Sequence, residues 1–202
     1  MPSIYDVKPA FQNLLRPVVR RLVAAGITPN QVTVTAFLLS VAAGAAICRW
    51  PSSPWPLLAL PVILLVRMAL NALDGMMARE HNLATPLGAI LNEAGDVAAD
   101  AALYLPLALV PSINGPLIVT VVVLAGLTEL VGITAATVGA SRRYDGPMGK
   151  SDRAFWLSAL ALAAALWPTG DLWFNLVLAV IVSLEVLTIA NRTRAALREI
   201  DS

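Results

Sequence analysis

Two short segments of the sequence carry polar side chains at the ends of runs that are otherwise apolar. Asn71 and Asp74 lie in the first segment, and Asn92, Asp96 and Asp100 lie in the second. The first pair is spaced by three and the other residues by four, so in helices each set shares one face. We therefore expect two oxygen-rich helix faces suited to a hard cation such as Mg²⁺ or Mn²⁺.

The residues around these segments favour a phosphate ligand over a zinc site. The sequence has one cysteine and one histidine, His81, so the usual zinc ligands are missing. Gly75, Ala78 and Gly88 are small enough for a bulky ligand to approach the backbone, and Arg79 offers a fork of donors to phosphate. Singly, each of these residues suits helix packing or a membrane-surface charge equally well. As a set, they indicate a binding site.

The composition predicts that an all-α, polytopic membrane protein positions these residues. Of 202 residues, 58% are hydrophobic and 13% are charged, and the net charge of +1 gives no indication of nucleic-acid binding. Such a chain has too little polar surface for a soluble globule. Six apolar stretches approach the roughly 20 residues that span a bilayer. They are residues 31–47, 55–73, 88–110, 116–139, 154–167 and 172–190.

The chain is expected to form a single membrane domain over residues 1–202. Residues 7–25 are predicted to form an amphipathic interfacial helix, with Arg16, Arg20 and Arg21 facing anionic lipid headgroups. A plain linker helix is the alternative. The six-helix transmembrane bundle covers residues 31–190, and residues 191–202 form a cytoplasmic tail. Basic residues concentrate on one side of the six spans, and Arg49 alone lies in the loops of the other, which places both termini and the polar cluster in the cytoplasm.

The polar cluster resembles a known signature. The sequence reads Asn71-Ala-Leu-Asp74-Gly75-Met-Met-Ala78-Arg79, then eight residues, then Gly88-Ala-Ile-Leu-Asn92-Glu-Ala-Gly-Asp96. This is similar to the CDP-alcohol phosphotransferase (CDP-alcohol phosphatidyltransferase) signature, D-x-x-D-G-x-x-A-R-x8-G-x-x-x-D-x-x-x-D. Residues 28–33 also resemble the family's entry to its first span, and the whole pattern is most similar to a bacterial branch, the YnbA-like proteins. The resemblance covers the chain and implies a bacterial inner-membrane location.

The resemblance implies a reaction in phospholipid biosynthesis. The family transfers a substituted phosphate from a CDP-linked lipid, usually CDP-diacylglycerol, to an acceptor hydroxyl and releases CMP. Asp96 matches the position expected to act as catalytic base. The implied ligands of one or two Mg²⁺ or Mn²⁺ ions are Asn71, Asp74, Asn92 and Asp96, with Asp100 as a further candidate. The implied CDP contacts are Asp74, Gly75, Ala78, Arg79 and Gly88, and the implied acceptor contacts are Lys150 and Arg153.

Two asparagines separate this chain from the signature. Asn71 and Asn92 stand where the signature has aspartates, so two of four carboxylates become neutral amides and affinity for a second dication is expected to fall. A non-catalytic relative that binds CDP-lipid or a partner enzyme is therefore the alternative. A transporter with an acidic site is disfavoured, because ion translocation does not require the signature's glycines and arginine at that spacing.

Three buried positions outside the signature leave alternatives open. Glu129 and Glu185 fall inside predicted spans, where an ionisable side chain is costly, and either pairing with Arg67 or facing a cavity would explain them. Gly132, with the small residues at 136 and 140, makes a stripe that either seams a homodimer or packs internally.

Overall fold

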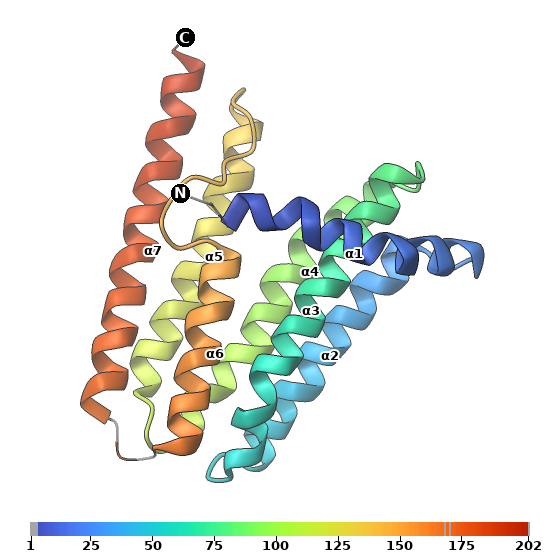
Figure 1. The fold of residues 1–202 in the computed structure, drawn as a ribbon. Coiled ribbons are helices and arrows are strands. Elements are labelled where there is room, and N and C mark those ends of the chain that lie inside the picture. The colour runs from blue at the N-terminus through green and yellow to red at the C-terminus, as the bar shows by residue number, and fades with distance from the viewer. Residues whose placement is uncertain (1–3, 168, 170, 202) are drawn as a thin grey trace. The chain divides into compact units, whose positions relative to one another are not determined.

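The computed structural model describes residues 4–167, 169 and 171–201, with backbone alone for residues 4–10. Within this part of the chain the secondary structure is helical, in agreement with the predicted all-α class (Figure 1). The elements are α1 (Ile4–Ala24), α2 (Pro29–Arg49), α3 (Pro54–Glu80), α4 (Pro86–Tyr104), the 3₁₀ helix η1 (Leu105–Leu109), α5 (Gly115–Thr137), α6 (Lys150–Leu166) and α7 (Asp171–Ile200).

Local sequence signals set several helix boundaries. Thr28 and Gln31 form a reciprocal cap on α2, in which the Thr28 amide donates to Gln31 Oε1 over 2.8 Å and the Gln31 amide donates to Thr28 Oγ1 over 3.3 Å. The Asn114 side chain caps α5 by accepting from the Leu117 amide at 3.2 Å. The α-helix α4 ends just before Pro106, and the 3₁₀ helix η1 follows. Proline has no N–H to donate to the backbone hydrogen bonds of an α-helix, so it favours this change.

The predicted elements map onto these helices with shifted ends. The amphipathic segment 7–25 is α1, and the six apolar stretches correspond to α2, α3, α4 with η1, α5, α6 and α7. α3 continues to Glu80, beyond the predicted end at residue 73, so the first half of the signature is helical throughout. The predicted tail is also helical as far as Ile200, and its last residue, 202, lies outside the described residues.

Four of the described helices, α2, α3, α5 and α7, are long and apolar enough to cross a membrane. α4 carries three carboxylates and α6 has 17 residues, so neither matches a simple apolar span. The chain is thus an all-α membrane protein, in which the polar residues of α4 interrupt an otherwise apolar run.

The chain divides into two units, which are described separately. Unit 1 comprises the chain up to Val41 together with Val62–Ala99, and unit 2 comprises Ala42–Pro61 together with Asp100–Ser202. In unit 1, Val19 of α1, Val32 of α2 and Met76 of α3 belong to one buried apolar cluster. α1 therefore packs its apolar face on α2 and on α3, which carries the first half of the signature.

Unit 2 is built on close contacts of α5, α6 and α7. α5 packs against α7 and η1, and α6 packs against α7.

Two glycines of unit 2 lie where helices pack closely. Gly44 of α2 has no room for a side chain, because a Cβ there would lie 1.9 Å from the carbonyl oxygen of Ala102 in α4. Gly132 is similarly closed, with Arg143 O 2.7 Å from the position of its absent Cβ. Gly132 thus packs internally, and the homodimer stays a prediction.

Candidate functional site

Asp74 is fixed in the buried part of unit 1. It lies on α3, is 4% exposed, and accepts a hydrogen bond of 2.7 Å at Oδ2 from the hydroxyl of Thr33 on α2. Thr33 belongs to the segment whose resemblance to the family's first span was recognised in the sequence. Its contact with Asp74 was not predicted, because helical spacing relates residues within one helix and not residues on two.

Asp96 is held by two side chains from α3. The Asn71 amide Nδ2 donates to Asp96 Oδ1 at 3.0 Å, and Arg67 Nη2 lies 3.8 Å from the same oxygen. Arg67 also donates to the backbone carbonyl of Asp96 at 3.3 Å and is only 2% exposed. The structure therefore brings together Asn71 and Asp96, which the spacing had placed on two facing helices. It adds Arg67 as a buried cation beside them.

The two signature glycines lie where a side chain would collide with a polar neighbour. A Cβ at Gly75 would lie 3.2 Å from both terminal nitrogens of Arg79, so the exposed guanidinium folds back over this glycine. A Cβ at Gly88 would lie 2.6 Å from Asn30 Oδ1. Protein side chains therefore lie close to both glycines, and the approach of a ligand to their backbone stays a prediction.

The candidate metal ligands fit a hard cation by the chemistry of their donors. Asp74 and Asp96 offer carboxylates and Asn71 and Asn92 offer amide oxygens, while the described residues contain no group of three or more His, Cys, Asp or Glu side chains arranged around one metal position. Asn71 directs its nitrogen at Asp96, so its oxygen becomes a ligand only after a half-turn of the amide. These donors suit Mg²⁺ or Mn²⁺ and do not suit a soft metal.

Asp100, the further candidate ligand, has a basic neighbour in unit 2. It follows Asp96 by one turn of α4, is buried, and its Oδ2 lies 3.5 Å from Arg153 Nη2. This ion pair joins the last turn of α4 to the first turn of α6. Its role as a metal ligand stays a prediction.

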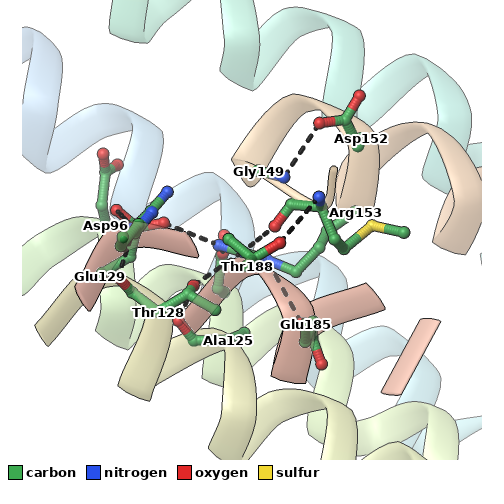
Figure 2. A network of polar contacts seen from close by, with 12 residues as sticks. Asp96, Ala125, Thr128, Glu129, Gly149, Asp152, Arg153, Glu185 and Thr188 are labelled. Carbon is green, nitrogen blue, oxygen red and sulfur yellow. Dashed lines mark hydrogen bonds and ion pairs between the residues drawn. The ribbon is translucent and has the colours of Figure 1, made fainter. Parts of the chain in front are cut away.

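Arg153 is the centre of a buried polar network in unit 2 (Figure 2). It is 1% exposed, and its Nη1 donates to the Thr128 hydroxyl at 3.1 Å. Its Nη2 donates to Glu129 Oε1 at 3.2 Å, and its Nε lies 3.9 Å from Glu185 Oε1. Three carboxylates, including Asp100, thus surround one guanidinium. Both glutamates that the sequence left unassigned pair with Arg153.

Glu129 also faces two other arginines. Its Oε2 lies 3.6 Å from Arg192 Nη1 and 3.9 Å from Arg142 Nη2, while Oε1 accepts from Arg153. We call Arg142, Arg153 and Arg192 the arginine cluster. Arg192 comes from α7, donates to the carbonyl of Thr128 and passes over Gly132, where a Cβ would lie 3.0 Å from its Nη1. Sequence reasoning missed Arg192, which it counted only as a cytoplasmic charge.

The loop before α6 is tied to α7 by charged side chains. Arg143 Nε donates to Asp145 Oδ2 at 2.8 Å and its Nη1 contacts Glu199. The hydrogen bond from Arg143 lowers the pKa of the Asp145 carboxyl below its ordinary value, and the same bond raises the pKa of Arg143. Lys150, a predicted acceptor contact, is the first residue of α6 and is half-buried.

Comparisons with known proteins agree with the resemblance in the sequence. Residues 26–193 match the model of the CDP-alcohol phosphatidyltransferase family. The inner membrane protein YnbA of Escherichia coli is 44% identical over 195 residues, which cover 96% of this chain and 96% of that protein. The predicted similarity to the YnbA-like branch is confirmed.

Solved structures share the fold at lower identity. The phosphatidylinositol phosphate synthase PgsA1 of Mycobacterium tuberculosis with CDP-DAG bound is 21% identical and superposes with a TM-score of 0.75, covering 89% of this chain and 92% of that one. The same synthase in complex with manganese and citrate also gives a TM-score of 0.75, at 21% identity, covering 90% and 88%. With the family model matching residues 26–193, this chain belongs to the CDP-alcohol phosphatidyltransferase family.

Proposed function

We propose that this protein transfers a substituted phosphate from CDP-diacylglycerol to the hydroxyl of an acceptor alcohol, releasing CMP. The observation that carries the proposal is the arrangement around Asp96. Its carboxylate is oriented by Asn71 and Arg67, within the signature that also holds Asp74. A carboxylate held in one orientation by neighbouring side chains is what general-base catalysis requires.

The proposed chemistry assigns the proton transfer to Asp96. Its carboxylate takes the proton of the acceptor hydroxyl while that oxygen attacks the phosphorus that carries the lipid. The bond from this phosphorus to the oxygen of CMP breaks, and CMP leaves with its negative charge. Arg67 holds the backbone and the side chain of Asp96, which fixes the direction in which the carboxylate points.

We propose one divalent cation, Mg²⁺ or Mn²⁺, at this site. Asp74 and Asp96 would hold it together with the amide oxygen of Asn92. The amide oxygen of Asn71 would join them once this amide turns by half, and Arg67 would then keep Asp96 in place. When bound, the ion would supply positive charge to the diphosphate. The two carboxylates balance the charge of one dication. Arg67 contributes a further positive charge beside Asp96, which disfavours a second ion in the same place.

The proposed CDP contacts lie where α3 ends and α4 begins. Arg79 is exposed and lies over Gly75, where its guanidinium donors are accessible to phosphate oxygens. Ala78 and Gly88 add no long side chain that would compete with the nucleotide. On the acceptor side, we propose Lys150 and Arg153, which open α6 in unit 2.

The proposed topology has six membrane crossings with both termini and the polar site in the cytoplasm, in a bacterial inner membrane. It adds α4 and α6 to the four apolar helices. The charged side chains of α4 have partners among neighbouring helices, such as Arg67 and Arg153, which lowers the cost of keeping them in a span.

CMP release tests the proposal. The full chain is reconstituted with CDP-diacylglycerol, Mn²⁺ and a panel of hydroxyl acceptors, with Asp96→Asn as the control for enzyme-independent hydrolysis. We expect CMP release by the wild type with at least one acceptor and release about 10²- to 10⁴-fold slower by the variant. A second function, CDP-lipid binding without turnover, is suggested by the two asparagines. Saturable binding of the nucleotide lipid without CMP release from any acceptor would favour it.

A further inference from the structure

The carboxylate of Glu129 lies among the three guanidinium groups of the arginine cluster, as a bound anion would. The cluster gathers one guanidinium from the loop before α6, one from α6 and one from α7, and all three face the same carboxylate at 3.2 to 3.9 Å. Convergence of several guanidinium groups from separate elements is how proteins bind phosphate oxygens. Here the anion is a side chain of α5.

The remaining donors of Arg153 are also engaged. Nη1 donates to Thr128 and lies 3.5 Å from the carbonyl oxygen of Met148, and Nη2 lies between Glu129 and Asp100. Only Nε lacks a hydrogen bond within the described residues, and the Glu185 carboxyl faces it at 3.9 Å. A phosphate group would reach Arg153 only by displacing a protein group, so Arg153 meets an acceptor at the side that Glu129 covers.

The arginines of the cluster already face carboxyl groups of the protein. Arg142, Arg153 and Arg192 lie near Asp100, Glu129 and Glu185 at 3.2 to 3.9 Å. Glu185 is 0% exposed, and neither of its oxygens accepts a hydrogen bond within the described residues. A phosphate monoester would add up to about two negative charges beside the carboxylate of Glu129, which costs desolvation and repulsion.

We infer that Glu129 determines the acceptor class: the acceptor is an alcohol that carries no phosphate monoester, because Glu129 fills the arginine cluster that would otherwise bind one. This inference rests on the proposed function, with Arg153 on the acceptor side. The accessible edge of the cluster is formed by Glu129 and Arg142, whose side chains are 14% and 31% exposed. Removing the Glu129 charge leaves this edge positive and open to phosphate.

The experiment compares Glu129→Gln with a matched variant, Glu199→Gln, in the purified full chain. Glu199 also pairs with an arginine of unit 2, Arg143, but lies outside the cluster. Binding of inorganic phosphate is measured by equilibrium dialysis with labelled phosphate. We expect phosphate to bind E129Q about tenfold or more tighter than wild type or E199Q. Adding Arg142→Gln to E129Q should remove the gain.

A second measurement uses the wild type alone, so it does not depend on the folding of a variant. CMP release is compared for glycerol against glycerol 3-phosphate and for inositol against inositol phosphate. We expect the unphosphorylated member of any pair that reacts to have the larger kcat/KM. A preference for the phosphorylated member, or wild-type phosphate binding as tight as that of E129Q, overturns the inference. Absence of CMP release from every acceptor overturns the proposed function instead, and phosphate binding then decides the inference.

Discussion

Unit 1 places one arginine beside Asp96 and neutral amides at two signature positions, whereas unit 2 places three carboxylates around Arg153. In unit 1 the side chains of Asn71 and Arg67 converge on a carboxylate. In unit 2 the side chains of Asp100, Glu129 and Glu185 converge on a guanidinium. The same residue types thus build two networks of opposite polarity.

The opposite polarity of the two networks determines what each region can bind. Asp96 is half-buried, and the signature in unit 1 holds a second carboxylate, Asp74, so unit 1 retains oxygen donors for a cation. In the arginine cluster Arg153 and Arg192 are buried, and Glu129 faces all three guanidinium groups, so a second anion would have to compete with this carboxylate.

The largest effect is expected at Asp96. Replacing Asp96 with asparagine keeps the shape of the side chain and its contact with Asn71 but removes the proposed base. General-base catalysis contributes about 10²- to 10⁴-fold in rate, so CMP release should fall by that factor. The measurement is kcat with CDP-diacylglycerol and a productive acceptor, with a thermal melt to check folding. Asp145→Asn, in the exposed loop before α6, is the matched control, and equal rates for both variants would contradict the assignment.

The next largest effect is on the stability of unit 2. Replacing Arg153 with methionine leaves Asp100, Glu129 and Glu185 facing one another without their shared cation. Removing one partner of a buried ion pair costs about 3–5 kcal/mol in the free energy of unfolding. Unfolding in detergent with increasing urea measures the change. Arg194→Met, an exposed arginine on α7, should change stability by less than about 0.5 kcal/mol. Similar losses for both variants would show that the network is not needed for stability.

A smaller effect is expected from restoring the signature carboxylates. Changing Asn71 and Asn92 together to aspartate adds two anionic oxygen ligands to unit 1, so Mn²⁺ should bind about tenfold or more tightly. Calorimetric titration should give one ion in the wild type, and a second ion when Arg67→Gln is added to the double variant. Asn191→Asp, on an exposed site of α7, is the control. Two ions in the wild type would refute the proposed role of Arg67.

The sequence was sufficient to predict what depends on neighbouring residues. Helical spacing predicted that Asn71 and Asp96 lie on facing sides of α3 and α4, and hydropathy predicted the helices themselves. The same reasoning could not find Thr33 as the partner of Asp74, or Arg192 as a neighbour of Glu129, because these pairs are 41 and 63 residues apart in sequence and depend on tertiary packing. Arg67 was recognised as an ionisable residue within a span, but its partner was left open. A buried charge signals that a partner exists without identifying it.

The smallest effect concerns the loop before α6, which lies at the edge of the arginine cluster through Arg142 and Arg143. The pKa of Asp145 is below its ordinary value of 3.8, chiefly because Arg143 donates a hydrogen bond to its carboxylate. The contact therefore stabilises the folded loop fully above that value and is lost as the pH falls through the lower folded-state pKa. Carboxyl ¹³C NMR of the labelled protein in micelles should give an Asp145 midpoint below 3.8 in the wild type.

Replacing Arg143 with glutamine should move the Asp145 midpoint upward, towards the value of a free carboxyl, whereas Arg194→Gln should leave it unchanged. Arg143 also contacts Glu199, so its loss would remove one of the contacts between this loop and the end of α7 without altering a charge of the arginine cluster. An Asp145 midpoint that is the same in all three proteins would mean that its titration is set by the surrounding backbone. In that case the loop would be held to α7 by the hydrogen bonds from Ser141 to Glu199, which do not involve Arg143.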